Sequence, residues 1–309
     1  MDIFEHLLTS PRAAPACEDV AAWWPRYLEI ARGWPSPIDR AMAGGHAADR
    51  LGWAFASGYQ AALGALVADL PEDTMAALCV TEAEGNTPRA IRSSLRPEGK
   101  GFVLDGSKRW TTLGPSGALF LVAARDEAAC GERVALRVAR VASTATGVRV
   151  ESMPPTRFVP EVPHAQLRFD GVRVAAEDLL PGDGYELYVK RFRTVEDLHV
   201  NAAMLAYLLC EGSRLGWPGE WFERVIALLM VLRSLALDNP ARPAVHIALA
   251  GALALARTLV TEAEQNWART ADDPAFARWQ RDRELLGTGA TLGVFQCESA
   301  GMRELMMRL

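Results

Sequence analysis

The spacing of apolar residues changes twice along the chain and predicts a helical region, a strand-rich region and a second helical region. Up to about residue 75, apolar side chains recur every three or four positions, as expected for helices with one buried face. Examples are Trp53, Tyr59, Leu63, Leu66 and Leu70. Prolines at positions 11, 15, 25, 35 and 37 predict that the first helices are short.

Between about residues 76 and 180, short runs rich in β-branched and aromatic residues alternate with turn residues, and about seven strands are predicted. The Asp105-Gly106 dipeptide separates the runs 101–104 and 108–112, and it predicts a type I′ hairpin turn. The other expected strands are 78–81, 119–124, 133–141, 147–153 and 165–169. Strands do not alternate with helices here, so a parallel Rossmann sheet is not expected.

From about residue 185 the helical spacing returns. Further helices are expected at 228–237, 245–263 and 276–307. Charged residues and prolines interrupt the apolar tract from Val225 to Ala256, which predicts two buried helices rather than a membrane span. The whole pattern predicts an α+β multidomain protein. Its expected domains are an N-terminal helical domain (1–75), a middle β domain (76–184) and a C-terminal helical bundle (185–309).

Composition narrows the classes of partner. The net charge of −5 argues against nucleic acid, because phosphate binding needs a concentrated basic face. The five cysteines are scattered without paired spacing, which fits a reducing cytosol, and the N-terminus shows no secretory signal. A cytoplasmic protein is therefore expected. The five histidines lie far apart in the sequence, so no metal site is predicted.

Two stretches of the middle region carry chemical information. The first begins with Cys79-Val80-Thr81-Glu82 and ends with Asp105-Gly106-Ser107-Lys108-Arg109-Trp110-Thr111-Thr112. The second is Phe169-Asp170-Gly171-Val172-Arg173-Val174, followed by a glycine-rich turn over 180–185. In this order and spacing they resemble the middle domain of acyl-CoA dehydrogenases, and the resemblance covers about residues 40–215.

The resemblance implies a central antiparallel β-barrel-like domain between N-terminal helices and a C-terminal four-helix bundle. It also implies FAD, with the flavin ring between the sheet and the bundle. Thr81 would then donate its hydroxyl to the polar edge of the flavin, and Trp110 would pack on the ring system. Thr112 would lie beside the flavin carbonyl and N5. Without the resemblance, Trp110 reads as a core aromatic and the threonines as ordinary strand residues.

The chain departs from the family pattern in the turn and in the bundle. The turn reads Glu84-Gly85-Asn86-Thr87-Pro88, one residue shorter than usual, and Asn86 and Thr87 are expected to offer polar contacts to a cofactor phosphate or a thioester. The arginine by which the family grips the flavin diphosphate is not obvious, and Arg214 and Arg224 are the candidate substitutes. The late catalytic glutamate of the family has no counterpart in the tail 301–309.

A minority of the family, the isovaleryl-CoA type, carries its catalytic glutamate at the start of the first bundle helix. Glu196 matches that position and is the candidate catalytic base. Helix chemistry alone offers an alternative, in which Thr194 caps the helix and Glu196 and Asp197 are first-turn acids at its positive end.

Three functions are therefore open. The first is a flavin-dependent oxidoreductase that performs α,β-dehydrogenation of a short acyl thioester, bound to coenzyme A or to a carrier protein. The second is a flavin-dependent monooxygenase on the same fold. The third is a non-catalytic relative that has lost its cofactor and acts as a partner subunit. The resemblance implies a homodimer or tetramer, and no membrane partner is expected.

Overall fold

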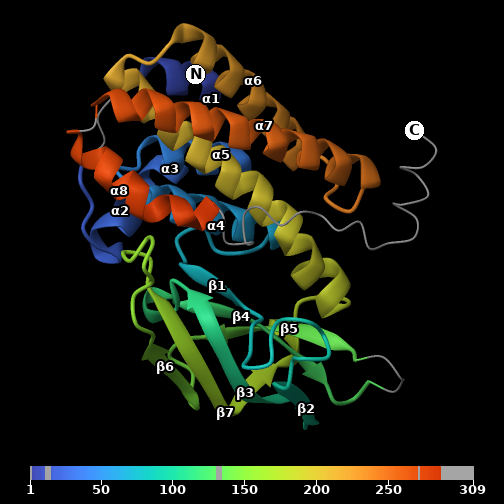
Figure 1. Cartoon of the computed structure of the whole chain (residues 1–309). Coiled ribbons are helices and arrows are strands. Elements are labelled where there is room, and N and C mark those ends of the chain that lie inside the picture. The colour runs from blue at the N-terminus through green and yellow to red at the C-terminus, as the bar shows by residue number, and fades with distance from the viewer. Residues whose placement is uncertain (1, 11–14, 130–133, 271, 287–309) are drawn as a thin grey trace. The chain divides into compact units, whose positions relative to one another are not determined.

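The computed structural model describes residues 2–10, 15–129, 134–270 and 272–286 (Figure 1). Within them the chain forms two compact units. The helical unit contains the described residues of 1–17, 25–62 and 194–286, and the sheet unit contains those of 18–24 and 63–193. The expected α+β class is confirmed, whereas the three domain boundaries stay a prediction.

Eight α-helices lie within the described residues. They are α1 (Ile3–Thr9), α2 (Val20–Ala31), α3 (Pro37–His46), α4 (Leu51–Leu66), α5 (Lys190–Leu215), α6 (Gly219–Ala236), α7 (Pro243–Trp267) and α8 (Pro274–Asp282). Short helical turns are η1 (Gly114–Ser116), η2 (Ala176–Asp178), η3 (Tyr185–Val189), η4 (Ala268–Thr270) and η5 (Arg283–Leu286). Of the helix expected over 276–307, the part beyond residue 286 lies outside the described residues.

The apolar tract from Val225 to Ala256 forms parts of α6 and α7, so the expectation of two helices is confirmed. These helices are less buried than expected. The segment Pro243–Thr270 is long and apolar enough to cross a membrane by length and composition, and 33% of its most apolar window is buried. A core helix of a soluble protein can pass the same test.

Glycines allow close backbone contact inside the helical unit. A Cβ on Gly45 of α3 would lie 2.0 Å from the Ala203 carbonyl oxygen of α5. A Cβ on Gly58 of α4 would lie 2.6 Å from the Val200 Cα, which also belongs to α5. The two helices therefore pack against α5 at a separation that any larger residue would increase.

Gly45→Ala is expected to lower the free energy of unfolding by about 2–3 kcal/mol, because the new methyl meets rigid backbone and not a movable side chain. Gly251→Ala is the matched control: this exposed glycine of α7 has no atom within 4 Å of the added Cβ. The control is expected to gain about 0.5–1 kcal/mol from helix propensity. Urea unfolding measures both, and equal stability of the two variants would contradict the packing argument.

Seven strands form one curled, mixed sheet in the sheet unit (Figure 1). They are β1 (Ala76–Cys79), β2 (Ser94–Glu98), β3 (Gly101–Thr112), β4 (Leu119–Asp126), β5 (Leu136–Ala142), β6 (Val148–Ser152) and β7 (His164–Ala175). Their order is β1-β4-β2-β3-β7-β6, with β5 also paired to β4. The expectation of an antiparallel sheet needs correction, because β1 and β2 both run parallel to β4.

The prediction of a hairpin turn at Asp105-Gly106 is wrong. Residues 101–112 are one strand, β3, and the turn into it lies at Gly99, where φ is 62°. Gly106 has a φ of 139° and marks a shift in the register of β3 against β7. The Asp105 carboxylate accepts a hydrogen bond from the Gly171 N–H at 2.8 Å. Asp105 thus lies opposite a bulge that Asp170-Gly171 forms in β7, and the Asp105-Gly106 dipeptide does not form a turn.

Alternating positions of the strands form the core of the sheet unit. On β4 these are Phe120, Val122 and Ala124, and on β7 they include Leu167 and Phe169. Because side chains alternate between the two faces of a strand, this inward set leaves the other face of β3 and β7 for polar residues and for Trp110.

Candidate functional site

Five of the six predicted site residues lie in the sheet unit. Thr81 follows β1, Asn86 and Thr87 lie in the turn after it, and Trp110 and Thr112 lie at the end of β3. The sixth residue, Glu196, lies on α5 in the helical unit.

Trp110 occupies a bulge of β3. The register against β7 shifts between Lys108 and Thr111, and the φ of Trp110 is 58°. A left-handed backbone costs a residue with a bulky side chain about 1–2 kcal/mol. Bulges re-aim side chains, and the indole here is 50% exposed. The strand therefore carries backbone strain at the residue that presents this aromatic ring to the surface.

His164, the first residue of β7, lies beside two predicted flavin residues. Its ring is 6.1 Å from the Trp110 ring at an interplanar angle of 70°, an edge-to-face arrangement. Its Nε2 is 3.5 Å from the Thr112 Oγ1. Burial lowers the pKa of His164, which favours the neutral imidazole near pH 7. The sequence interpretation did not include His164.

Thr81 is fixed against β3. Its carbonyl oxygen accepts a hydrogen bond from the Arg109 N–H at 2.8 Å, one residue before Trp110. The structure therefore brings Thr81, Trp110 and Thr112 to adjoining segments of the sheet unit. Two threonine hydroxyls and one indole face form a donor set suited to the polar edge and the flat ring of a flavin.

A buried ion pair holds these segments together, and the sequence interpretation assigned it no role. Lys108 is fully buried, and its Nζ lies 2.6 Å from the Glu82 Oε1 and 3.3 Å from the Val80 carbonyl oxygen. Glu82 also accepts hydrogen bonds from the Ser93 hydroxyl at 2.7 Å and from the Arg92 N–H at 2.6 Å. One carboxylate thus ties β3 to both ends of the turn that contains Asn86 and Thr87.

In this buried ion pair the pKa values of both Glu82 and Lys108 are shifted. Burial would raise the pKa of Glu82, but the bond and charge of Lys108 outweigh it and the pKa is lowered. Burial also lowers the pKa of Lys108, and Glu82 opposes this effect. Ionised partners at such a short separation in a buried place are costly to separate.

Asn86 and Thr87 are both exposed. The turn is closed by Glu82 and Gly85, whose backbones exchange hydrogen bonds of 2.9 and 3.1 Å, with Gly85 at a φ of 119°. Within the described chain neither the Asn86 nor the Thr87 side chain forms a hydrogen bond, so both are available to a ligand. Their contact with a phosphate or thioester stays a prediction.

The helix that contains Glu196 begins earlier than the sequence indicates. α5 starts at Lys190, directly after the π-helical turn η3. Thr194 therefore does not cap it: this residue is buried, and its hydroxyl lies 3.4 Å from the His246 Nδ1. The interpretation of Glu196 as a first-turn acid is wrong. Glu196 is half-buried in the second turn, and its role as a base stays a prediction.

The two arginines considered for a flavin diphosphate are already paired. Arg214 forms ion pairs with Glu211, at 2.6 Å, and with Asp273. Arg224 binds Glu262 through two nitrogens, one of them at 2.8 Å. Neither guanidinium is therefore free to grip a diphosphate in this conformation. The donor set of the sheet unit fits the ring of a flavin better than its phosphate end.

Metal chemistry finds no support in the described residues, where no group of three or more His, Cys, Asp or Glu side chains could hold a metal ion. Cys17, Cys79 and Cys210, which belong to the described part of the chain, are buried and form no disulfide there. The tail 301–309 lies outside the described residues.

Comparisons with known proteins agree with this geometry. A family model of the acyl-CoA dehydrogenase middle domain matches residues 77–172, the segment that carries β1 to β7. The mitochondrial very long-chain specific acyl-CoA dehydrogenase of Rattus norvegicus is 33% identical over 124 residues, which are 37% of this chain and 19% of that protein. The match thus spans about a fifth of the length of this curated relative.

Solved structures share the fold over most of the chain. Butyryl-CoA dehydrogenase from Megasphaera elsdenii has a TM-score of 0.74 at 15% identity, covering 99% of this chain and 98% of that one. FMN-bound TdsC from Paenibacillus sp. A11-2 has a TM-score of 0.68 at 16% identity, covering 92% and 88%. All three comparisons point to the acyl-CoA dehydrogenase family, and the expected resemblance is confirmed. The TdsC structure contains FMN, and the sheet unit of the present chain is consistent with a flavin.

Proposed function

We propose that the chain is a flavin-dependent oxidoreductase that removes two hydrogens from a short acyl thioester. The observation that carries this proposal is the strained, half-exposed Trp110, which follows Arg109, the residue bonded to the Thr81 carbonyl oxygen, and lies two positions before Thr112 on β3. Strain at a residue of this size persists only where the surrounding structure enforces it, and such residues gather at functional sites. The match to the acyl-CoA dehydrogenase middle domain supports the same interpretation.

The proposed cofactor is FAD. Trp110 would pack on the flavin ring, Thr81 would donate to its polar edge, and Thr112 would lie near its N5. Asn86 and Thr87 would contact a phosphate or the thioester. Because Arg214 and Arg224 are paired elsewhere, FMN is the competing form. Heat-releasing the cofactor from purified protein and chromatographing it against FAD and FMN standards distinguishes the two.

The proposed reaction divides one oxidation between two acceptors. The half-buried Glu196 carboxylate takes the proton from Cα of the acyl chain, and a bound flavin supplies the acceptor for the hydride from Cβ. The Cα–H electron pair becomes the new double bond, so the substrate loses two electrons and the cofactor gains them. An external electron acceptor, not identified here, then reoxidises the cofactor. The thioester is on coenzyme A or on a carrier protein.

The absorption spectrum of the purified protein is the first test. A band near roughly 450 nm is expected from a bound flavin, with bleaching on anaerobic addition of a short acyl-CoA. A colourless protein that cannot be reconstituted with FAD or FMN would instead support the cofactor-less partner subunit. Bound flavin that acyl-CoA leaves oxidised would contradict dehydrogenation.

A flavin-dependent monooxygenase is the second candidate. The likeness to an FMN-bound structure and the paired state of Arg214 and Arg224 favour it, because both point away from a bound diphosphate. Such an enzyme needs no carboxylate base. Oxygen consumption with substrate hydroxylation, undiminished in Glu196→Gln, would establish it over the dehydrogenase.

Trp110→Gly is expected to separate stability from cofactor binding. Glycine adopts a φ of 58° without strain, so the free energy of unfolding should stay within about 1 kcal/mol of the wild type. Flavin affinity should fall at least about tenfold with loss of the ring contact. Leu113→Gly is the matched control, because Leu113 has the same φ but is fully buried, and it should cost about 3 kcal/mol or more. Unchanged flavin affinity in Trp110→Gly would contradict the assignment.

The protein is further proposed to form a homodimer or tetramer in the cytoplasm. Large apolar side chains are exposed on and just after α6 and on α7. They are Met230, Val231, Leu237 and Leu255. Monomeric soluble proteins rarely expose apolar patches of large area, which supports an association through these helices. Light scattering on the purified protein measures its mass, and a monomer at micromolar concentration would contradict this point.

A further inference from the structure

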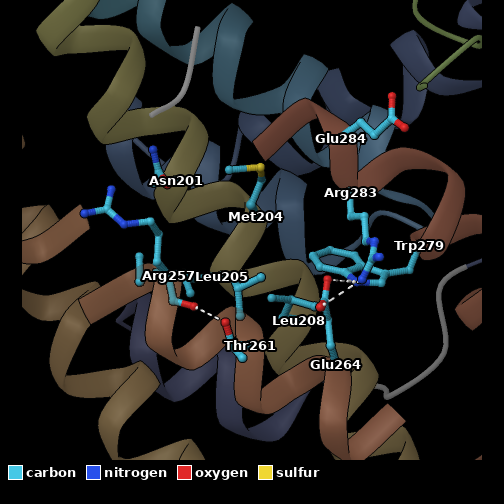
Figure 2. A pocket seen from close by; sticks show the side chains of 12 residues that line it. Asn201, Met204, Leu205, Leu208, Arg257, Thr261, Glu264, Trp279, Arg283 and Glu284 are labelled. Carbon is cyan, nitrogen blue, oxygen red and sulfur yellow. Dashed lines mark hydrogen bonds and ion pairs between the residues drawn. The ribbon is translucent and has the colours of Figure 1, made fainter. Parts of the chain in front are cut away.

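The helical unit contains a cavity of 360 Å³ between α5, α7 and the α8–η5 segment, here called the bundle cavity (Figure 2). This volume lies in the range of small-molecule sites, which are often built between the helices of bundles. None of the residues assigned to the proposed flavin site lines it. The bundle cavity is therefore a separate feature with its own chemistry.

The floor of the bundle cavity is apolar. Met204, Leu205 and Leu208 of α5 are almost fully buried, and Ala256 and Val260 of α7 complete the lining. The small Ala256 side chain leaves room where a larger residue would fill the space. A hydrocarbon chain placed here would gain burial without leaving any polar group unpaired.

One end of the bundle cavity is closed by a satisfied polar cluster. The Glu264 carboxylate accepts hydrogen bonds from the Trp279 indole N–H and from Arg283, both at 3.1 Å, as Figure 2 shows. The Glu264 carboxylate is therefore neutralised within the wall by Arg283.

The other end has an uncompensated cation. Arg257 is exposed at the mouth of the cavity, and it has no acidic partner among the described residues. Asn201 lies at the same end in Figure 2, and its amide nitrogen donates to the Asp197 carbonyl oxygen at 2.7 Å. An arginine at the mouth of an apolar cavity is well suited to bind one anionic head group.

Charge balance decides which anion fits. Arg283 is engaged by Glu264, so Arg257 is the cation of the lining that is left to meet a ligand, and it matches a single negative charge. Glu284 also lines the cavity, near Arg283 in Figure 2, and its negative charge disfavours a doubly charged ligand such as a phosphate.

We propose that the bundle cavity binds a monocarboxylate with a straight hydrocarbon chain, its head group at Arg257 and its chain along Met204, Leu205 and Val260. The site is distinct from the flavin residues and does not depend on the proposed function. A free carboxylate carries no thioester, so its binding is measured whether or not the protein holds a flavin.

Calorimetric titration of the full chain with hexanoate, octanoate and decanoate tests the proposal. One molecule is expected to bind, and each added methylene should tighten binding about threefold as it enters the apolar floor. Arg257→Gln should weaken decanoate about tenfold, because a charge-assisted contact is lost from an exposed residue. Arg269→Gln is the matched control, since Arg269 is an exposed arginine of the same unit outside the lining, and it should bind as the wild type does.

A second variant reports occupancy directly. Val260→Cys places a thiol in the wall, and decanoate should slow its reaction with a maleimide at least several-fold relative to the wild-type background. Absence of binding, or equal binding in Arg257→Gln and wild type, would overturn the proposal. A Val260→Cys thiol that is unreactive without decanoate would also overturn it. The cavity would then be covered by protein, either residues 287–309 or a second copy of the chain.

Discussion

Lys108→Met is expected to lower the free energy of unfolding by about 3–5 kcal/mol, the usual cost of breaking a buried ion pair by removal of one partner. Methionine matches the length of the lysine stem, so packing changes little. The Glu82 carboxylate is buried at 7% exposure, and it would lose the cation that lies 2.6 Å away. The loss should appear in urea unfolding as a lower midpoint.

Lys190→Met is the matched control for this prediction. Lys190 also pairs with a carboxylate, Glu186, at 2.8 Å, but both side chains are more than half exposed. An exposed pair of this kind contributes about 0.5 kcal/mol or less. Equal destabilisation by the two substitutions would show that the Glu82–Lys108 pair is no stronger than a surface pair.

The pH dependence of the free energy of unfolding provides an independent test of Lys108→Met. In the wild type the pKa of Glu82 lies below its ordinary value, so its stabilisation is present above that value and is lost as the pH falls. Without Lys108, burial should raise the pKa of Glu82 above its unfolded value. Stability would then be lost as the pH rises. The gap between Lys108→Met and wild type should therefore narrow on acidification towards about pH 4.

Local pattern predicted where helices and strands lie, but not how the strands pair. Gly106 and Gly171 do adopt the positive φ that an Asp-Gly dipeptide favours, at 139° and 60°. The conformational preference of glycine in the dipeptide is therefore met, but β7 pairs beside β3, so Asp105 lies opposite a bulge of β7 and not in a turn. β2 was missed because Ser94–Glu98 has one buried residue and a proline, so its pairing and not its composition makes it a strand.

The candidate site was only partly visible for a related reason. Glu82 and Lys108 lie 26 positions apart, and no local spacing rule relates residues on two different segments. His164 is 52 residues from Thr112 and meets it only because β7 pairs with β3. The strain at Trp110 arises from one extra residue in a bulge, which sequence alone does not reveal.

Glu196→Gln is expected to lower the rate of flavin reduction by an acyl-CoA by about 10²–10⁴-fold, the usual contribution of a positioned base. Glutamine keeps the size of the side chain and cannot accept the α proton. Flavin content and thioester affinity should stay within about twofold of the wild type. Anaerobic stopped-flow absorbance measures the reduction, and exchange of the α proton with deuterium oxide measures the proton step alone.

The start of α5 at Lys190 makes this test sharper than a rate measurement by itself. A first-turn acid would contribute about 0.3–1 kcal/mol through the helix dipole, whereas Glu196 lies in the second turn, beyond the strongest part of that field. Through the helix dipole, Glu196→Gln should therefore cost less stability than the loss of a first-turn acid, while it removes the exchange of the α proton. Glu186→Gln serves as the contrasting control: Glu186 lies in the first turn of η3, directly before α5, and pairs with Lys190, so this variant should lose up to about 1 kcal/mol while it keeps the exchange of the α proton. A destabilised Glu196→Gln protein that still exchanges the proton would place the base elsewhere and return Glu196 to a structural role.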